Sequence, residues 1–521
     1  MIDIPLITAL QNPAIYDHPV VEIRLFETHI SWVILTGNYV YKIKKPLDLG
    51  FLDFSTLELR KHYCEQELLL NRRLAPELYL DVVSLSGSPQ HPVINGPGEA
   101  FEYAVRMRQF DPKQQLDKLL ARGKLTQAHI DQLADTVAAF HQRIEKAAAD
   151  TSFGTPERVW FPVEENFNQI TPRLHEASEL ARLDQLRQWC QVNFDKLANT
   201  IKQRKQNSFV RNCHGDMHLA NMTLIDDQVT IFDCIEFNDN FRWIDVISEI
   251  AFTAMDLIDR RRPDFAARLL NRYLQHTGDY EGLALLQFYQ VYRALVRAKV
   301  AIIRSTQPGL SEQEKKREFQ NYRDYNQLAE SFTKATKPVL FIAHGVSGSG
   351  KTTLTQPLLE CFGMIRLRSD VERKRLFGMT AEMRSDSKTD QGIYTADASQ
   401  QTYQRLMSLA TETIKAGYST IVDATFLKRE QRQLFRELAT QLDVPFVILH
   451  FHADEQLLRQ WINERLAHGK DASEATIEVL EHQLRTEHPL SSDEADHIIS
   501  IDSGFDDAAD MLIDAVAELD N

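Results

Sequence analysis

Two short motifs in this sequence contain the residue types that phosphoryl transfer requires. The first, HGDMHLAN at residues 214–221, places Asp216 five positions before Asn221, and Asp233 follows at the end of the apolar run VTIF. Phosphoryl transfer from a nucleotide to a hydroxyl uses an aspartate that accepts the hydroxyl proton and an asparagine that binds a metal ion. It also uses a second aspartate that joins the metal to the phosphates. The order and spacing of the three residues fit this scheme.

The second motif, GVSGSGKT at residues 345–352, satisfies the pattern G-x-x-x-x-G-K-[ST]. It lies between an apolar run at 339–343, typical of a buried strand, and a helical segment that begins near Lys351. In such a loop the backbone N–H groups and the helix N-terminus hold phosphates, the lysine reaches the β- and γ-oxygens, and the threonine binds magnesium. We expect ATP to be bound by Gly345, Ser347, Gly348, Ser349, Gly350, Lys351, Thr352 and Thr353. We also expect Lys351 to act in catalysis and Thr352 to bind magnesium.

The segment RLRSDVERKRLFG at 366–378 narrows the reaction at this second motif. A short strand leads into a helix on which Asp370 and Arg373 are three residues apart and share one face. The aspartate is suited to accept a hydroxyl proton, and the arginine to hold an anionic part of the substrate. Ser369 and Glu372 also form an S-x-x-E capping box, which explains part of the segment by structure alone. We expect Asp370 to be a catalytic base and Arg373 a substrate ligand.

Charged residues further along the chain are further candidates for the site formed by the second motif. The strand-like run STIVDATF ends in Asp423, in the position of a Walker-B-type carboxylate or a substrate contact. The helical segment at 458–473 carries Arg459 and Arg465 and runs into a Gly/Lys/Asp turn. An arginine near the nucleotide neutralises the charge that develops on the transferred phosphate, whereas many arginines on helices only face solvent. Both interpretations stay open for these two arginines.

The elements before residue 75 supply residues for the first motif. Two β-rich runs meet at Gly37-Asn38, which predicts a hairpin, and helical spacing follows over 55–74. Glu67 falls on the apolar stripe of this helix and therefore needs a partner, because an unpaired buried charge is costly. Lys42 in the strand YVYKIK is the expected partner, and the pair would hold the lysine against the ATP phosphates. Lys44 points to the same face and remains an alternative.

Composition and charge limit the classes of function. The chain has 521 residues, 43% of them hydrophobic and 26% charged, which predicts a globular protein with more than one core. A net charge of −15 argues against broad electrostatic affinity for nucleic acid or for an anionic membrane. The five scattered cysteines contain no C-x-x-C pair, and the N-terminus does not read as a secretion signal. We expect a cytoplasmic protein that contains no membrane-spanning segment.

The pattern of elements predicts two domains. Strand-like and then mainly helical segments fill the first part of the chain. Pro338 and the run VLFIAHG then open a series of apolar strands, at 339–343, 419–422 and 446–451, that alternate with helices. Such alternation is typical of a parallel sheet in an α/β domain. We predict an N-terminal domain at 1–332, a linker at 333–337 and a P-loop domain at 338–521.

Residues 22 to about 330 resemble the aminoglycoside phosphotransferase family, which is related to choline and homoserine kinases. The hallmark of that family is H-G-D-x-H-x-x-N followed by a metal-binding aspartate. The resemblance implies a bilobal, protein-kinase-like α+β domain that uses ATP and magnesium. It implies roles for Asp216 as catalytic base, Asn221 and Asp233 on magnesium, and Lys42 with Glu67 on ATP.

The same resemblance implies that His214 braces the loop and that residues 107–110 form the hinge beside adenine. This sequence departs from the family in two places. No glycine-rich loop over the phosphates is recognisable, and the metal-aspartate segment reads FDCIEFND where aspartate-tryptophan-glutamate is usual. A kinase fold that keeps the first motif only for packing is the structural alternative.

Residues 338 to about 500 resemble small P-loop kinases, a group that contains polynucleotide 5'-hydroxyl kinases, zeta-type toxins and chloramphenicol phosphotransferase. The resemblance rests on GSGKTT, RSDVERKRL, VDATFLKREQR and the segment at 458–473. It implies Asp370 as general base, Arg373 on the acceptor's phosphate and Arg465 as the lid arginine. The whole arrangement is similar to a bacterial family that fuses an aminoglycoside-phosphotransferase-like domain to such a kinase domain.

We therefore expect an ATP- and magnesium-dependent phosphotransferase with two domains. The P-loop domain would phosphorylate a hydroxyl of a small molecule or of a nucleic acid, and the N-terminal domain would be a second small-molecule kinase. In the alternative, the N-terminal domain binds ATP or a metabolite without turnover and regulates a nucleic-acid 5'-hydroxyl kinase. The motifs do not encode the identity of either acceptor.

Overall fold

The computed structural model describes residues 3–50, 52–307, 309–381, 383–385, 391–468 and 472–520. The chain divides into two compact units. Unit 1 contains Met1–Gln132, Ala139–Glu165 and Ala198–Asp256. Unit 2 contains Leu133–Ala138, Asn166–Leu197 and Leu257–Asn521. The predicted domain boundaries at 332 and 338 stay a prediction.

Unit 1 begins with α1 (Asp3–Ala9) and an antiparallel sheet in the order β1-β2-β3-β6-β4-β5. The strands are β1 (Arg24–Glu27), β2 (Ser31–Leu35), β3 (Tyr39–Lys44), β4 (Tyr79–Ser88), β5 (His91–Ile94) and β6 (Ala100–Arg108). The predicted hairpin is confirmed, because β2 and β3 pair on either side of Gly37. Gly37 has φ +100°, a conformation that favours glycine.

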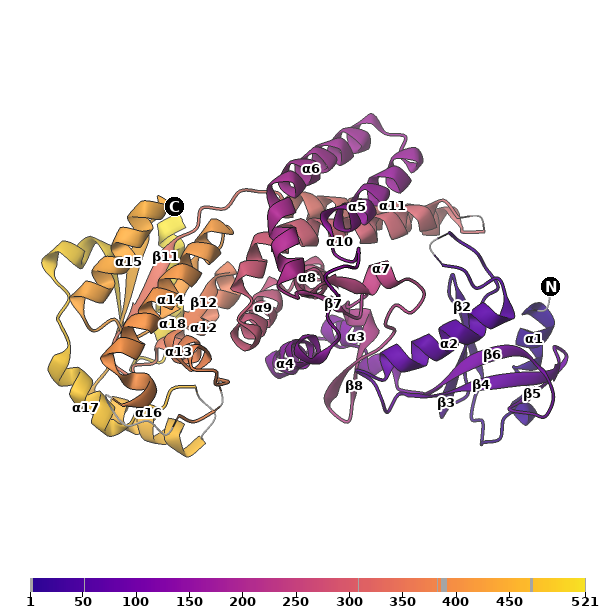
Figure 1. Ribbon diagram of the computed structural model, residues 1–521, viewed down its shortest axis with the longest axis horizontal. Coiled ribbons are helices and arrows are strands. Elements are labelled where there is room, and N and C mark those ends of the chain that lie inside the picture. Colours follow the sequence, from indigo (N-terminus) through magenta and orange to yellow (C-terminus); the bar gives the residue numbers. More distant parts are fainter. Residues whose placement is uncertain are drawn as a thin grey trace. The chain divides into compact units, whose positions relative to one another are not determined.

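The predicted helix at 55–74 is α2 (Leu57–Asn71), which lies along this sheet in Figure 1. Because successive side chains of β3 point to opposite faces of the sheet, Tyr41 and Ile43 lie on the same face, where they belong to an apolar core. Lys42 and Lys44 therefore point to the other face, towards α2, and both reach Glu67 on that helix.

The remainder of unit 1 carries the first motif between short strands. Its strands and short helix are β7 (Val210–Asn212), β8 (Met222–Ile225), β9 (Gln228–Ile231), α7 (Asp239–Arg242) and β10 (Trp243–Asp245). A turn at Asp226-Asp227 joins β8 and β9, and both aspartates have a positive φ. Of the helices in this part of the chain, α3 (Leu116–Ala121) belongs to unit 1. Four others have residues in both units: α4 (Gln127–Arg143), α5 (Pro156–Ile170), α6 (Ala177–Gln206) and α8 (Val246–Asp259).

The part of unit 2 directly before the P-loop sheet contains α9 (Pro263–Thr277), α10 (Leu283–Ser305) and α11 (Glu312–Phe332). α10 is rich in buried apolar residues and packs against α11. Within the described residues, no helix combines the length and the apolar character that crossing a membrane requires.

The P-loop sheet is parallel, with the order β12-β13-β11-β14-β15. The strands are β11 (Leu340–His344), β12 (Ile365–Arg368), β13 (Thr420–Asp423), β14 (Phe446–His452) and β15 (Ile498–Asp502). The helices are α12 (Lys351–Phe362), α13 (Ser369–Leu376), α14 (Ala396–Lys415), α15 (Arg429–Leu442), α16 (Glu455–His468), α17 (Ile477–Thr486) and α18 (Ala508–Ala517). The predicted parallel sheet and the mixed α/β and α+β fold class are confirmed.

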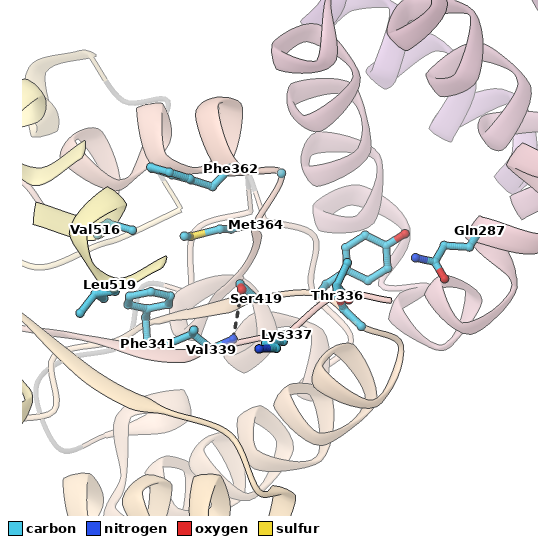
Figure 2. Close-up of a pocket in the computed structure, with 13 residues that line it drawn as sticks. Gln287, Thr336, Lys337, Val339, Phe341, Phe362, Met364, Ser419, Val516 and Leu519 are labelled. Atoms are coloured by element: carbon cyan, nitrogen blue, oxygen red, sulfur yellow. Dashed lines mark hydrogen bonds between the residues drawn. The ribbon is translucent and has the colours of Figure 1, made fainter. Parts of the chain in front are cut away.

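Helices cover both faces of this sheet (Figure 1). Leu358 and Leu359 of α12 share one apolar cluster with Leu512 and Val516 of α18 and with the inward side chains of the strands. α14 and α15 contact β11, β12, β13 and β14. A cavity of about 430 Å³ lies at the opposite end of the strands from the P-loop, lined in part by Phe341, Met364 and Lys337 (Figure 2).

The edge strand β12 is covered by α9. The side-chain amide of Asn271 donates to the carbonyl of Met364 at 2.8 Å and accepts the backbone N–H of Arg366 at 2.9 Å. Arg268 on the same helix pairs with Glu360 of α12 at 2.8 Å. Asn271 thereby pairs one carbonyl and one N–H at this edge of the sheet, from a helix that precedes the predicted P-loop domain in the sequence.

Candidate active sites

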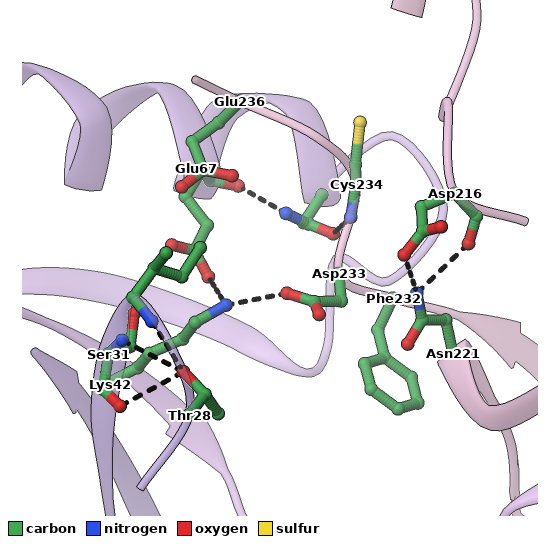
Figure 3. A network of polar contacts seen from close by, with 12 residues as sticks. Thr28, Ser31, Lys42, Glu67, Asp216, Asn221, Phe232, Asp233, Cys234 and Glu236 are labelled. Atoms are coloured by element: carbon green, nitrogen blue, oxygen red, sulfur yellow. Dashed lines mark hydrogen bonds and ion pairs between the residues drawn. The ribbon is translucent and has the colours of Figure 1, made fainter. Parts of the chain in front are cut away.

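The loop after β7 brings two of the predicted residues into direct contact (Figure 3). The Asn221 Nδ2 group donates to Asp216 Oδ2 at 2.9 Å and to the Asp216 carbonyl at 3.0 Å. His218 Nε2 lies 3.4 Å from the same Oδ2 atom. The Asp216 side chain is 37% exposed. Its carboxylate is thus held in one orientation and remains accessible to an acceptor hydroxyl.

Three polar side chains on one face of α8 hold the loop at 214–219. Glu249 accepts two of its backbone N–H groups, at 2.9 and 2.6 Å. Thr253 Oγ1 donates to a loop carbonyl at 2.7 Å, and Asp256 Oδ2 accepts another N–H at 2.9 Å. The sequence analysis missed these residues. Their signal is polar side chains at i, i+4 and i+7 in a mainly apolar helix, VISEIAFTAMDLID.

The protonation states around this loop follow from burial and contacts. Burial raises the pKa of Glu249, but its hydrogen bonds and the nearby His141 outweigh burial and lower the pKa to about 2. Burial lowers the pKa of His214, so its ring is neutral. Its Nε2 donates to the Phe232 carbonyl at 2.9 Å, and its Nδ1 accepts the Asp216 N–H at 3.3 Å. His214 therefore braces the loop, as expected.

Asp233 is held in an uncommon backbone conformation. Its φ is +65°, in the left-handed region that non-glycine residues rarely adopt. The backbone N–H donates to the hydroxyl of buried Tyr79 at 3.1 Å, and a carboxylate oxygen lies 2.6 Å from Lys42 Nζ. These two contacts fix the orientation of the Asp233 carboxylate beside the Lys42 ammonium group, and the Asp233 side chain is 44% exposed.

Both candidate lysines of β3 contact Glu67. Lys42 Nζ lies 2.8 Å from Glu67 Oε1, and Lys44 Nζ lies 2.7 Å from Glu67 Oε2. Lys44 also pairs with Glu236, a residue that the sequence analysis did not select. Burial raises the pKa of Glu67, but the two ammonium groups outweigh burial and lower it to about 2. Only Lys42 reaches Asp233, and its side chain is 14% exposed against 1% for Lys44.

The oxygen donors near Asp216 suit a magnesium ion. Because the Asn221 Nδ2 group is bound to Asp216, the amide oxygen Oδ1 has no hydrogen-bond partner among the residues that the structure describes. One Asp233 oxygen is paired with Lys42, which leaves the second for a metal. Amide and carboxylate oxygens are the ligands that magnesium prefers. The side chains of Asn221 and Asp233 therefore fit the predicted metal role.

The second motif forms a tight turn between β11 and α12. Gly345 has φ +143°, and a Cβ there would lie 2.4 Å from the Phe451 carbonyl oxygen. Gly348 has φ +87°, and a Cβ there would lie 2.8 Å from Ile462. Glycine is thus required at both positions. Of the predicted ATP contacts, Ser349 is buried and Thr353 lies on the exposed side of the first turn of α12.

The two functional side chains at the start of α12 point inward. Lys351 Nζ donates to the carbonyls of Gly345 and Val346 at 2.8 and 2.7 Å. Burial lowers the pKa of Lys351 to about 8, although Asp423 and Asp370 oppose the shift. Thr352 Oγ1 donates to Asp423 Oδ2 at 2.7 Å, so the predicted magnesium threonine and the carboxylate that ends β13 are brought together.

A residue that the sequence analysis missed contacts the P-loop backbone. The side-chain oxygen of Gln483 on α17 accepts the N–H of Ser347 at 2.7 Å. Leu480 on the same helix belongs to an apolar cluster with Val346 and Ile462. No local pattern marks Gln483, because its contact depends on how α17 folds back onto the loop.

The predicted acceptor residues lie at the start of α13. Asp370 is partly exposed, and within the described part of the chain its carboxylate has no hydrogen bond or ion pair. Arg373 is buried, and its Nη1 donates to the Ile393 carbonyl at 3.1 Å. Its Nε atom is buried without a partner in the described residues, and the Tyr394 ring lies 5.3 Å from its guanidinium carbon.

The predicted capping box at the start of α13 is wrong. Arg368 occupies the N-cap position, no side chain caps the helix, and Ser369 is already the first helical residue. Glu372 instead pairs with Arg375 and lies 3.6 Å from Arg405. The helix begins one residue earlier than the capping pattern requires, so Ser369 lies inside the helix and the capping explanation for this segment does not hold.

The two arginines of α16 differ in their contacts. Arg459 pairs with Glu455 at 2.7 Å and Glu481 at 3.0 Å on the surface. Arg465 donates from Nη2 to the Ala475 carbonyl at 2.8 Å, and its Nε atom is buried without a partner in the described residues. The Gly/Lys/Asp turn within the predicted lid segment at 458–473, residues 469–471, lies outside the described residues.

Comparison with known proteins identifies both domains. Residues 75–286 match the model of a phosphotransferase enzyme family, and residues 340–490 match that of an AAA domain. The expected fusion of a phosphotransferase domain with a P-loop domain is confirmed. The first match contains the 214–221 motif and Asp233 but begins after Lys42 and Glu67.

Individual proteins are similar over different parts of the chain. An uncharacterized protein of Mycobacterium tuberculosis is 28% identical over 464 residues, which are 88% of this chain and 89% of that protein. A structure of the amicoumacin kinase hAmiN covers 61% of this chain and 92% of its own, with 12% identity and a TM-score of 0.40. A gluconokinase from Sinorhizobium meliloti covers 35% of this chain and 94% of its own, with 19% identity and a TM-score of 0.26.

Proposed function

We propose that this chain, in which a phosphotransferase-family domain precedes an AAA-type P-loop domain, transfers the γ-phosphoryl group of ATP to hydroxyl acceptors at two separate sites. Magnesium would serve both sites. The observation that carries the proposal is the convergence of complete sets of side chains. At the first site, Lys42 and Asp233 are 191 positions apart in sequence, yet their charged groups lie 2.6 Å apart.

At the N-terminal site, Asp216 accepts the proton of the acceptor hydroxyl, and its hydrogen bond from Asn221 keeps the accepting oxygens oriented. Lys42, held by Glu67, binds the α- and β-phosphates of ATP. Asn221 and Asp233 hold magnesium, which when bound offsets the negative charge on the transferred phosphoryl group. Catalysis here consists mainly of positioning and charge compensation, which suits a site built from fixed charges.

At the C-terminal site, the P-loop amides and Lys351 bind the β- and γ-phosphates, and Thr352 with Asp423 supplies oxygen ligands for magnesium. Asp370 takes the acceptor proton. Arg373 holds an anionic part of the acceptor, and Arg465 stabilises charge on the transferred group. The contact between Thr352 and Asp423 supports this assignment, because it joins the loop to the strand end where a metal ligand is needed.

The acceptors are hydroxyl-bearing small molecules under this proposal. A 5'-hydroxyl oligonucleotide is an alternative acceptor for the C-terminal site only. The net charge of −15 disfavours it, because a polyanion is repelled by the chain as a whole.

Nucleotide stoichiometry tests the two-site proposal. Isothermal titration with a non-hydrolysable ATP analogue and magnesium should give two molecules bound per chain. Lys42→Ala and Lys351→Ala should each bind one molecule of the analogue per chain, and the double variant should bind none. Lys61→Ala, which removes an exposed lysine of α2, is the matched control and should keep two. One molecule bound to the native chain, lost only with Lys351→Ala, would refute a nucleotide site in the N-terminal domain.

A further inference from the structure

Five charged side chains of alternating sign form a line beneath the N-terminal site. The line runs from Glu236 through Lys44, Glu67 and Lys42 to Asp233. The two oxygens of Glu67 are divided between the lysines, at 2.8 Å to Lys42 and 2.7 Å to Lys44. Phosphate positioning in a kinase of this type needs one lysine and one glutamate. The inner pair, Lys44 and Glu236, is therefore additional.

The inner end of the line is closed to solvent. The side-chain exposures are 1% for Lys44, 0% for Glu67 and 4% for Glu236. The Lys44 ammonium also lies 4.8 Å from the centre of the Phe54 ring, a cation–π contact. The other end opens at Asp233, whose side chain is 44% exposed. Lys44 and Glu236 thus have no access to a nucleotide, and their effect must pass through Glu67.

The line joins three separate elements. Lys44 is on β3, Glu67 is on α2, and Glu236 follows Asp233 by three residues in the loop after β9. A movement of α2 that separates Glu67 from Lys42 would also leave Lys44 with only one carboxylate in a buried place. Breaking a buried ion pair in this way is strongly unfavourable. The Lys42–Glu67 pair is therefore kept formed before any nucleotide arrives.

We propose that Lys44 and Glu236 are positioning residues of the N-terminal site, which lock Glu67 in the place where it holds Lys42 against the phosphates of ATP. This inference rests on the proposed N-terminal kinase site. It assigns to Glu236 a role distinct from that of the metal-binding Asp233, although both belong to the segment FDCIEFND.

The test uses the full chain with Lys351→Ala. This substitution weakens nucleotide binding at the P-loop site, so the measured binding comes from the N-terminal site. In this background, Lys44→Met should lower the affinity for a fluorescent ATP analogue with magnesium at least tenfold. Glu236→Gln, which keeps an acceptor for Lys44, should lower it less. The matched control is Glu102→Gln. It breaks the buried Arg60–Glu102 pair, which ties the same helix α2 to β6 at 2.9 Å, and does not touch Glu67.

The control separates positioning from general loss of stability. Glu102→Gln should lower the melting temperature and leave nucleotide affinity within twofold of the parent. Equal affinity losses in Lys44→Met and Glu102→Gln, or no loss in Lys44→Met, would overturn the inference.

A second readout does not depend on nucleotide. Backbone hydrogen exchange at residues 64–71, around Glu67, should become faster in Lys44→Met and stay unchanged in Glu102→Gln, because Arg60 lies at the other end of α2. If the Lys351→Ala parent binds no nucleotide, the proposed N-terminal kinase fails. Hydrogen exchange then decides whether Lys44 locks Glu67: unchanged exchange in Lys44→Met refutes the lock.

Discussion

At the residue scale, the lysines proposed to bind phosphate at the two sites, Lys42 and Lys351, have different electrostatic surroundings. Burial lowers the pKa of both. Asp233 and Glu67 in direct contact more than compensate at Lys42, whose pKa is raised well above its usual value. Lys351 contacts neutral carbonyl groups, and its pKa falls to about 8. The first lysine therefore stays charged at every physiological pH, whereas the second loses its proton near pH 8 when the loop is empty.

This difference predicts unlike pH dependence of nucleotide binding. In a Lys42→Ala chain, the affinity of the C-terminal site for an ATP analogue should be constant below pH 8. Above pH 8 it should fall by up to about tenfold per pH unit, because binding then requires uptake of a proton. In a Lys351→Ala chain, the N-terminal site should show no such fall up to pH 9.5. Titration calorimetry over this range decides, and identical profiles would contradict the assignment.

Glu249 gives a stability prediction at the same scale. Its pKa is lowered from 4.5 to about 2 in the folded chain, so its contribution is present above pH 4.5 and is lost as the pH falls towards 2. The contribution amounts to about 3 kcal/mol at neutral pH. Denaturant unfolding of Glu249→Gln should show a deficit of this order at pH 7 that shrinks below pH 4.5. A deficit independent of pH would contradict the charge-based role.

At the element scale, the sequence predicts elements whose signal is local. Gly37, the P-loop and the runs at 339–343 and 419–422 fix turns and strands through backbone requirements or periodicity, and these predictions are confirmed. β15 at 498–502 was not predicted, because only its position beside β14 makes it a strand. The capping box at Ser369 is absent because the helix begins one residue earlier than the local motif predicts, directly after β12.

The residues of the candidate sites also divide into those with a local sequence signal and those that depend on distant contacts. Asp216, Asn221 and Asp233 were predicted because the motif spaces them in order. Glu236 was not predicted, because its partner Lys44 lies 192 positions away and no local pattern links the two. The sequence could not show whether Lys42 or Lys44 is the better candidate for the ATP lysine, because strand alternation places both on one face. The contact of Lys42 with Asp233 favours Lys42, and this contact is visible only in the structure.

The packing of α9 on β12 yields an element-scale prediction. Asn271→Ala removes the amide that satisfies a carbonyl and an N–H of the edge strand. It should destabilise the P-loop domain by about 1–3 kcal/mol, the cost of leaving such groups without partners. Arg272→Ala on the same helix breaks a partly exposed pair with Asp135 and should cost under about 1 kcal/mol. Thermal unfolding monitored in both variants provides the comparison, and equal losses would contradict the role of α9.

At the scale of the whole molecule, each candidate site is complete within one compact unit. The residues of the first site, from Lys42 to Asp256, belong to unit 1, and those of the P-loop site belong to unit 2. Among the described residues, the side chains proposed for each site come from one unit. Under the two-site proposal, loss of one site should therefore leave the chemistry of the other intact.

The most direct measurement is transfer of labelled γ-phosphate from ATP to a panel of acceptors by the native chain, Asp216→Ala and Lys351→Ala. The panel contains aminoglycosides, sugars, nucleosides, and 5'-hydroxyl RNA and DNA. The two-site proposal predicts that each variant loses transfer to a different acceptor and keeps the other. If Lys351→Ala abolishes all transfer and Asp216→Ala abolishes none, the N-terminal domain is a regulator and the proposal of two kinases is wrong.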